Sequence, residues 1–426
     1  MRRPVGPIES EPFDLVVFWK QNDSGIYGRR SDLLITEVAR SDSVAHTIQF
    51  DAPISASRLI QLSRPDPDGE RTHNRMVHEA TMRRVRGEAH DEHISRYTFV
   101  YDDRPDASGR WTRPDEFGDF VAEVLDRHRV GERDVAFWVY PTLADAPDLI
   151  DRFRPAVVVA DVVDDNRTWF AAGSEQHMRL TANYAATFAR SDVIIANCGG
   201  VRDAMCEFDV DIEIIANACE PVRPASRRRP KPPHELAAVT GPIIGYVGNL
   251  SSRIDVALIA HLAEARPDCH VVLIGSTHAG HDVLELTRFP NVAILGPRRL
   301  DEAKRYIAAF DVAIIPHLDN DMTRAMQPLK AFVYCSMGVP VVSTSVANID
   351  GLSELIVIAE THDEFVEAVD AALRRGRRRS SARLRQIVDE NSWPVRARQV
   401  LQLIERIRQR AAGPGKGLSG PRCGGR

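Results

Sequence analysis

The sequence predicts an α/β protein built from two Rossmann-like domains that face each other across a cleft. Three observations carry this prediction. The chain has 426 residues, too many for one ordinary hydrophobic core. Short apolar runs alternate with helical patterns in both halves, which is typical of parallel sheets covered on both faces. A stretch rich in Pro and Arg, residues 221–233, separates the two series of elements.

The first series begins with an apolar strand at 13–19, followed by a loop with two glycines and a helix from Ser31. Further strands are predicted at 136–140, 156–160 and 193–196, with helices at 143–153 and 178–189 between them. The polar, Arg-rich segment 64–118 is expected to form loops and short helices inserted in this domain.

The second series has strands predicted at 242–247, 270–274, 292–295, 312–316, 339–343 and 355–358, with helices such as 255–265 and 301–310. The predicted division is a first domain over 1–225, a linker over 226–240, a second domain over 241–392, a helix over 393–410 that crosses back to the first domain, and a disordered tail over 411–426. Ligands of such sheets bind at the carboxyl ends of the strands, so the chemistry should come from loops that follow strands.

Composition excludes several classes of protein. The net charge of -5 argues against a general nucleic-acid binder. Apolar runs stay far below the ~20 residues that a membrane helix needs, and the first residues lack the apolar core of a signal peptide. We therefore predict a cytoplasmic protein. The six cysteines have no zinc-like spacing, and Asp319-Asn-Asp321 is too common a loop pattern to predict a metal.

Lys330 is the strongest single candidate for a functional residue. Only five of the 55 basic residues are lysine, and Lys330 lies just inside a predicted helix start, after Gln327 and Pro328. That position favours an anion and disfavours a cation, so a cation there is best explained by an anionic ligand. Thr323 and Arg324 bring further donors to the same end of the sheet.

A second candidate is the turn after the strand 242–247. Gly248 would let a ligand approach the backbone closely, and Arg253 with the following helix N-terminus would suit a phosphate. Ser252 is the expected N-cap of that helix. An ordinary strand-to-helix turn with a surface arginine explains the segment equally well.

Two segments of the first domain add candidates. The loop 19–30 combines Gly25 and Gly28 with three basic residues, Lys20, Arg29 and Arg30, and would suit an anionic or hydroxylated substrate. A charged surface loop is the alternative. The acidic residues at 161–165 include a candidate general base, or they cap the next helix.

The motifs of the second domain resemble those of the bacterial group 1 glycosyltransferases, which have the GT-B fold. The resemblance rests on Ile244-Gly-Tyr-Val-Gly-Asn-Leu, Val272-Leu-Ile-Gly, Phe310-Asp-Val-Ala-Ile-Ile-Pro, Gln327-Pro-Leu-Lys and Gly338-Val-Pro-Val-Val-Ser. Weaker matches in the first domain are Ser191-Asp-Val-Ile-Ile-Ala-Asn and Ile214-Ile-Ala-Asn. The resemblance covers residues 10–410.

The resemblance implies roles for these candidates. The first domain would take the acceptor and the second the nucleotide-sugar donor. Donor residues would be Gly248, Asn249, Arg253, Gly275, Pro297, Arg298, Thr323, Arg324, Gln327, Pro328 and Lys330, with Arg253 and Lys330 at the diphosphate. The loop with Lys20, Gly25, Gly28, Arg29 and Arg30 would face the acceptor and the donor sugar. Where many members carry two acidic residues eight positions apart, this chain has Ala325 and Val333.

The leading hypothesis is a metal-independent glycosyltransferase of polysaccharide, glycolipid or secondary-metabolite biosynthesis. Its donor would be a UDP-, GDP- or dTDP-sugar, with no further cofactor and no nucleic-acid partner, and peripheral membrane association stays open. Asp23 or Asp164 would activate the acceptor hydroxyl. A sugar-nucleotide epimerase on the same fold and a non-catalytic nucleotide-sugar-binding scaffold are the alternatives.

Overall fold

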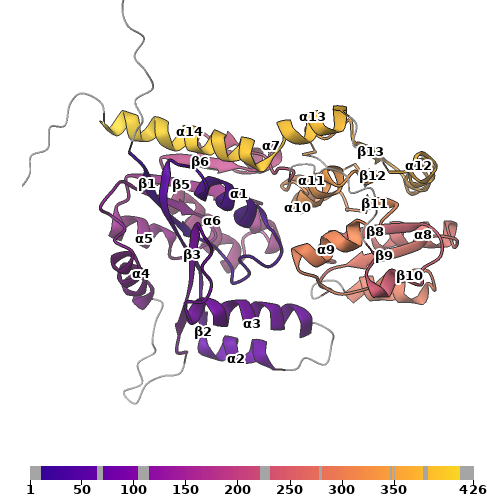
Figure 1. The fold of residues 1–426 in the computed structure, drawn as a ribbon, viewed down its shortest axis with the longest axis horizontal. Coiled ribbons are helices and arrows are strands. Elements are labelled where there is room, and N and C mark those ends of the chain that lie inside the picture. The colour runs from indigo at the N-terminus through magenta and orange to yellow at the C-terminus, as the bar shows by residue number, and fades with distance from the viewer. Residues whose placement is uncertain are drawn as a thin grey trace, which may run out of the picture.

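The computed structural model describes residues 11–64, 71–103, 115–220, 231–277, 281–345, 348–349, 351–377 and 382–412. They form two α/β units, each around its own parallel sheet (Figure 1). Residues 226–230 of the predicted linker and 413–426 of the predicted tail lie outside the described residues.

The first sheet has seven parallel strands in the order β3-β2-β1-β4-β5-β6-β7. Its strands are β1 (Phe13–Phe18), β2 (Val44–Ser55), β3 (Ile94–Tyr101), β4 (Val135–Val139), β5 (Val157–Val162), β6 (Val193–Ala196) and β7 (Glu213–Ile214). The helical elements of this unit are α1 (Arg30–Ala39), α2 (Ala56–Ser63), α3 (Arg71–Val85), α4 (Asp115–Arg127), α5 (Ala146–Phe153), η1 (Asn166–Trp169), α6 (Glu175–Phe188), α7 (Gly199–Ala204) and η2 (Cys206–Phe208).

The second sheet has six parallel strands in the order β10-β9-β8-β11-β12-β13. Its strands are β8 (Ile243–Val247), β9 (His270–Ile274), β10 (Val292–Ile294), β11 (Val312–Ile315), β12 (Val341–Thr344) and β13 (Ile356–Ala359). The helical elements are η3 (His234–Leu236), α8 (Val256–Ala265), η4 (His281–Arg288), α9 (Leu300–Ile307), α10 (Asp321–Arg324), α11 (Leu329–Ser336), α12 (His362–Arg375), α13 (Ala382–Glu390) and α14 (Trp393–Ala412).

Both sheets are buried on their two faces, which explains their runs of Val and Ile. Successive side chains of a strand point to opposite faces, so Val16 and Phe18 of β1 enter one hydrophobic cluster, and Leu15 and Val17 enter another. Both sheets have the strand order of a dinucleotide-binding fold, with the first strand in the middle. The predicted α/β architecture with two parallel sheets is therefore confirmed.

The last helix, α14, packs against the first domain, lying along it at the top of Figure 1. Trp393, Ala397, Val400 and Ile404 complete the cluster formed by one face of the first sheet. The chain thus passes between the domains twice, and the two passages touch, because the Cys219 amide donates to the Asn391 carbonyl at 2.6 Å.

The segment 64–118 differs from our prediction. It contains the whole 15-residue helix α3 and the eight-residue strand β3, which pairs with β2, a long strand that we also missed. Thr47, Gln49 and Asp51 interrupt the apolar pattern of β2, yet all three are buried. Asp51 forms a buried ion pair with Arg84 of α3 at 3.1 Å, which compensates for burying the charge of this strand residue inside the domain.

Two smaller predictions also need correction. The N-cap of α8 is Asp255, whose carboxylate accepts a hydrogen bond from the Leu258 amide at 2.8 Å, and Ser252 lies in the preceding loop. Part of the predicted linker packs on the second domain, since Leu236 is buried in one of its two hydrophobic clusters.

We predict that Gly245→Ala destabilises the second domain by about 1–3 kcal/mol, as expected for overpacking a closed core. A Cβ on Gly245, in the middle of β8, would lie 2.2 Å from the Phe310 ring. Denaturant unfolding would measure the change. Gly199→Ala is the matched control because the nearest atom to its Cβ is 3.9 Å away. Equal unfolding free energies for the two variants would contradict the prediction.

Candidate functional site

Lys330 lies in the first turn of α11, next to the end of β8. Its Nζ is 3.2 Å from Nε2 of His317 and 4.9 Å from the centre of the Tyr246 ring. A Cβ on residue 248 would lie 2.8 Å from the Lys330 Cε, and Gly248 has a φ of 153°. Glycine is therefore required at 248, both for its backbone conformation and for the passage of the lysine side chain.

Arg253 is held beside this lysine by the loop between β8 and α8. Its carbonyl accepts a hydrogen bond from the Leu318 amide at 2.8 Å, and Ile254 forms an antiparallel bridge with His317. The guanidinium contacts Oγ of Ser251 at 3.2 Å and the Met326 sulfur at 3.7 Å. The loop is thus pinned to the segment that follows β11, which fixes where Arg253 can point.

Neither cation forms an ion pair with a residue that the structure describes. Among the residues that the structure describes, no carboxylate lies within 4 Å of the Lys330 ammonium or of the Arg253 guanidinium. Burial, and then the charge of Arg253, lower the pKa of Lys330 to about 7, while Asp164 acts in the opposite direction. Burial also lowers the pKa of His317, with Lys330 and Arg253 adding to the effect. Such a group of positive charges at a helix start is suited to an anionic ligand.

Asp164 and Lys20 bring the first domain to this site. The Lys20 Nζ donates to Oδ1 of Asn166 at 3.1 Å. Burial lowers the pKa of Lys20, and Asp164 opposes that shift. Burial raises the pKa of Asp164, whereas Lys20 and Arg253 lower it. The carboxylate of Asp164 is thus influenced by cations of both domains.

The acidic segment after β5 was expected to supply either a general base or a helix cap, and two different residues fit these two roles. Asp165 caps η1 by accepting from the Arg167 amide at 3.1 Å, and its carboxylate pairs with the Arg167 guanidinium. Asp165 is therefore a capping residue. Asp164 makes no such cap and remains the candidate base.

The other predicted residues of the first-domain loop are engaged within the protein. Asp23 accepts from the Trp19 indole at 2.9 Å and pairs with Arg29 at 2.6 Å. Arg30 is buried and pairs with Asp161 at 3.3 Å. The Gly25 amide donates to Asp32 at 2.8 Å. Gly28 lies against the second domain, where a Cβ would come 2.3 Å from Leu300. These residues shape the loop, while Lys20 and, more weakly, Arg29 act on the charge of Asp164.

Several predicted donor residues have structural partners as well. The Gln327 Oε1 accepts from the Asn217 amide at 2.6 Å across the domains, which is a different partner from the one we predicted. Thr323 belongs to the capping box of α10, and Arg324 pairs with Asp319. Arg298 contacts Glu235 and Tyr306. Pro328 is the N-cap of α11, and Pro297 is buried. The Asn249 carbonyl accepts a hydrogen bond from the Tyr246 hydroxyl, and the Gly275 amide donates one to the Gly296 carbonyl.

The domains touch at several points near this site, which together we call the domain junction. The junction consists of the contacts Asp165–Ala325, Asn217–Gln327, Gly200–Asn348, Ile26–Leu300 and Glu79–Arg299. The shortest of these hydrogen bonds joins the Asn217 backbone amide to Gln327. The Nδ2 of Asn217 also donates to the Gln327 carbonyl at 3.0 Å. The loops after the strands of both sheets are thereby brought together.

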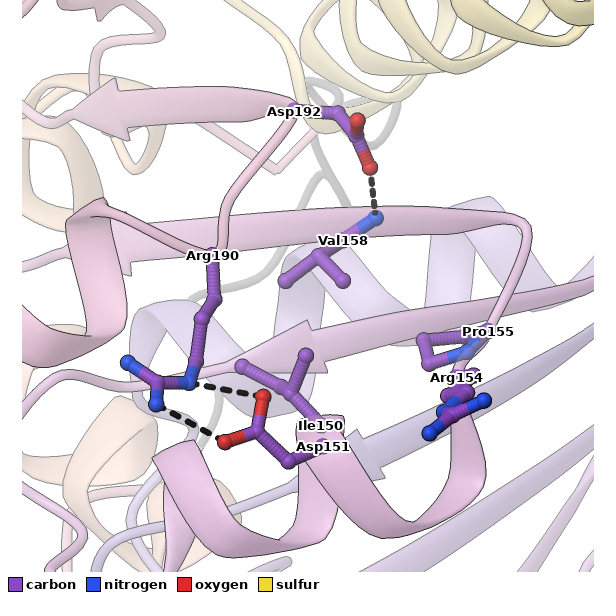
Figure 2. Close-up of a pocket in the computed structure, with 7 residues that line it drawn as sticks. All are labelled: Ile150, Asp151, Arg154, Pro155, Val158, Arg190 and Asp192. Atoms are coloured by element: carbon purple, nitrogen blue, oxygen red, sulfur yellow. Dashed lines mark hydrogen bonds and ion pairs between the residues drawn. The ribbon is translucent and has the colours of Figure 1, made fainter.

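A surface hollow of about 390 Å³ lies elsewhere, beside the start of β5 (Figure 2). Figure 2 shows Arg190 paired with both carboxylate oxygens of Asp151, and Asp192 accepting from the Val158 amide. These polar groups already satisfy one another. The hollow is also at the amino end of the strand, away from where ligands of this fold bind.

His317 and Tyr246 are site residues that our sequence reasoning did not single out. Both lie on or directly after strands and resemble core residues there, and both are buried. The one available signal was the position of His317 at the carboxyl end of β11, the same edge from which Lys330 is reached. In the described residues, no set of three His, Cys, Asp or Glu side chains could hold a metal ion, and no helix is long and apolar enough to cross a membrane.

Comparison with known proteins agrees with this geometry. Residues 241–375 match the family model described as glycosyl transferases group 1. Most of the second domain is therefore similar to the group 1 glycosyltransferases. A curated relative, a putative teichuronic acid biosynthesis glycosyltransferase of Bacillus subtilis (strain 168), is 26% identical over 169 residues. That match spans 38% of this chain and 43% of the relative.

Solved structures extend the likeness to both domains. Sucrose-phosphate synthase from Thermosynechococcus elongatus superimposes with a TM-score of 0.63 at 13% identity, over 94% of this chain and 100% of that one. Trehalose-6-phosphate synthase from E. coli, bound with UDP-2-fluoro glucose, gives 0.60 at 12% identity, over 93% and 99%. At these identities the likeness concerns the fold, and the fold is GT-B.

We predict that the affinity of the protein for a nucleoside diphosphate sugar falls as the pH rises above about 7. Lys330 has a pKa of about 7 in the empty protein, and a bound diphosphate would raise it. Ligand binding above that pH must therefore be accompanied by proton uptake. At about one pH unit above the pKa, the number of protons taken up should approach one per binding site. Calorimetry in two buffers of different ionisation enthalpy would measure the uptake.

The control for this titration is Lys330→Arg, because a guanidinium keeps its charge across the same range. Its affinity should depend little on pH. An affinity of the unaltered protein that stays constant between about pH 6.5 and 8.5 would contradict the assignment of the titration to Lys330.

Proposed function

We propose that this protein is a glycosyltransferase that moves a sugar from a nucleotide-diphosphate sugar to a hydroxyl group of an acceptor. The observation that carries the proposal is the pair Arg253 and Lys330, two cations without a carboxylate within 4 Å among the described residues, at the carboxyl edge of the second sheet. The match of the same domain to group 1 glycosyltransferases supports it.

The bond between sugar and diphosphate breaks with a build-up of negative charge on the departing diphosphate. We propose that the Lys330 ammonium, the Arg253 guanidinium and the N-terminus of α11 stabilise that charge. Because Gly248 leaves the Lys330 side chain in contact with the backbone of the turn, the ammonium is already positioned before the donor arrives.

On the acceptor side we propose Asp164 as the group that receives the proton of the acceptor hydroxyl. Burial raises its pKa, which makes a carboxylate a better proton acceptor. Asp23, the other candidate, is held in place by Trp19 on one carboxylate oxygen and by Arg29 on the other. Lys20 would then help to orient Asp164 and the acceptor.

The donor that we propose is a UDP-, GDP- or dTDP-sugar. The comparison structure of trehalose-6-phosphate synthase holds UDP-2-fluoro glucose, which supports a nucleoside diphosphate sugar as a class. We further propose that residues 1–225 take the acceptor and residues 241–392 the donor. By analogy with the Bacillus relative, the acceptor would be a growing polysaccharide.

Replacing Lys330 with Ala should weaken donor binding by about 30-fold, the equivalent of about 2 kcal/mol for one hydrogen bond to a charged group. Turnover should fall further, because the ammonium would act most strongly on the departing diphosphate. A thermal-shift screen against nucleoside diphosphates and their sugars, followed by a transfer assay, would measure both effects.

Lys304→Ala is the matched control for that experiment. Lys304 is another of the five lysines, but it pairs with Glu220 at 2.6 Å on α9. Unchanged binding and turnover in Lys330→Ala would remove the central residue of the proposal, and a protein that binds no nucleoside diphosphate at all would overturn the proposed function.

Asp164→Asn should reduce transfer by about 10²–10⁴-fold while leaving donor binding nearly unchanged, which is the usual contribution of a positioned general base. The amide keeps the shape of the side chain and removes the proton acceptor. Asp23→Asn is the comparison, expected to have a smaller effect on transfer and a larger one on stability. Equal losses of transfer in the two variants would exclude Asp164 as the base.

A further inference from the structure

His317 lies directly behind Lys330 and makes contacts that our proposed function does not yet use. It is 2% exposed and follows β11. Its amide donates to Oγ1 of Thr344 at 3.1 Å, and its carbonyl accepts from the same hydroxyl at 2.6 Å. The backbone of His317 is therefore fixed on both sides, and its ring stands edge-on to Tyr246 with 6.3 Å between ring centres.

The contact with Lys330 constrains the protonation state of the ring. A lysine ammonium can only donate a hydrogen bond, so the Nε2 of His317 at 3.2 Å is the acceptor whenever Lys330 is charged. The ring is then neutral and carries its proton on Nδ1. Burial and the two neighbouring cations, which lower the pKa of His317, favour the same neutral state.

The Nδ1 of His317 has no hydrogen-bond partner within the described part of the chain, although it is buried. An unpartnered buried donor costs free energy of folding. A leucine or methionine would fill this volume without that cost. The bond from Lys330 is the contact of this side chain that offsets the cost, which points to a role through the lysine.

The same residue also reaches the second cation. Ile254 bridges to His317, and the amide of Leu318, the next residue, donates to the Arg253 carbonyl. The backbone of 317–318 therefore holds the loop of Arg253, while the ring of His317 supports the ammonium of Lys330. The same segment after β11, residues 317–318, therefore holds both positively charged groups in place.

We propose that His317 is a positioning residue for the donor diphosphate: its neutral imidazole accepts a hydrogen bond from Lys330 and fixes the ammonium next to Arg253. The inference rests on the proposed function, since it assigns to that anion site the group that orients it. His317 does not itself contact the diphosphate. Because the imidazole is neutral, it does not repel the ammonium. Its Nε2 can therefore accept a hydrogen bond from Lys330 without adding a third positive charge.

The test compares two substitutions of His317. Leu has a similar volume and no acceptor, whereas the amide oxygen of Gln can reach the position of Nε2. We expect H317L to weaken binding of UDP-glucose, or of whichever UDP-, GDP- or dTDP-sugar the wild-type protein binds, by roughly tenfold, and H317Q to restore most of the loss. Both variants should retain the far-UV circular dichroism of the wild type.

A double-mutant cycle separates positioning from packing. If His317 acts through Lys330, then H317L should weaken binding roughly tenfold in the wild-type background and hardly at all in the K330A background. Equal losses in the two backgrounds would overturn the proposal. If H317L does not fold, H317Q decides alone: binding within about threefold of wild type supports the proposal, and a larger loss overturns it.

The pH profile gives a readout that a purely structural role would not move. Lys330 is faced by Arg253, Asp164, His317 and the Tyr246 ring. Loss of the acceptor in H317L removes a hydrogen bond to the charged ammonium, so the alkaline limb of binding should move to lower pH. An unmoved limb would contradict the inference. Failure of the wild-type protein to bind any nucleoside diphosphate would instead refute the proposed function, so the two failures are distinguishable.

Discussion

Two positive charges with no carboxylate within 4 Å, among the described residues, are the constraint on which this site depends. Arg253 and Lys330 are close enough for the first to depress the pKa of the second. Bringing like charges together costs free energy, and the protein meets that cost with fixed geometry: a glycine at 248, a bridge between Ile254 and the end of β11, and a neutral ring behind the ammonium. An anion at this point would relieve the repulsion, so the geometry suits an anionic ligand.

The other domain enters this balance through Asp164. Its carboxylate is the anion that opposes the loss of the Lys330 charge, and both Lys20 and Arg253 favour its ionised form. The two halves of the proposed reaction are therefore electrostatically connected across the domain junction. A diphosphate at Lys330 would add negative charge in the neighbourhood of Asp164 and so raise the pKa of that carboxyl further. Donor binding would in this way strengthen the proton acceptor on the acceptor side.

The sequence was sufficient for the two-sheet architecture, and it drew attention to Lys330, whose functional role stays a prediction. Buried parallel strands of Val and Ile leave a clear pattern, and lysine at a helix start in an arginine-rich chain is conspicuous. Strand β2 escaped because its buried Thr47, Gln49 and Asp51 resemble surface residues in the sequence, and the pairing of Asp51 with Arg84 of α3 appears only in the fold. His317 escaped for the opposite reason, since a lone histidine after an apolar strand does not reveal which side chain it supports.

Most of the remaining candidates were charged or glycine residues in the right loops whose partners could not be known. Arg30 meets Asp161 and Gln327 meets Asn217 over separations that local patterns do not report, whereas Arg324 pairs with Asp319 in the same short segment. Ala325, where many family members carry an acid, contributes its backbone carbonyl to the Asp165 amide. The family resemblance pointed to these loops. The contacts that their side chains make within the protein then indicate which of them could still bind a ligand.

The position of α14 has a consequence for biosynthesis. The face of the first sheet that it covers includes Leu15, Val17, Trp138 and Val159, residues that leave the ribosome long before Trp393 and Ile404. The first domain is synthesised first, but its hydrophobic cluster is complete only when the last helix has been made. Until the second domain has been translated, the apolar surface that α14 covers lacks this helix. A nascent chain in this state would depend on chaperones or on rapid closure to escape aggregation.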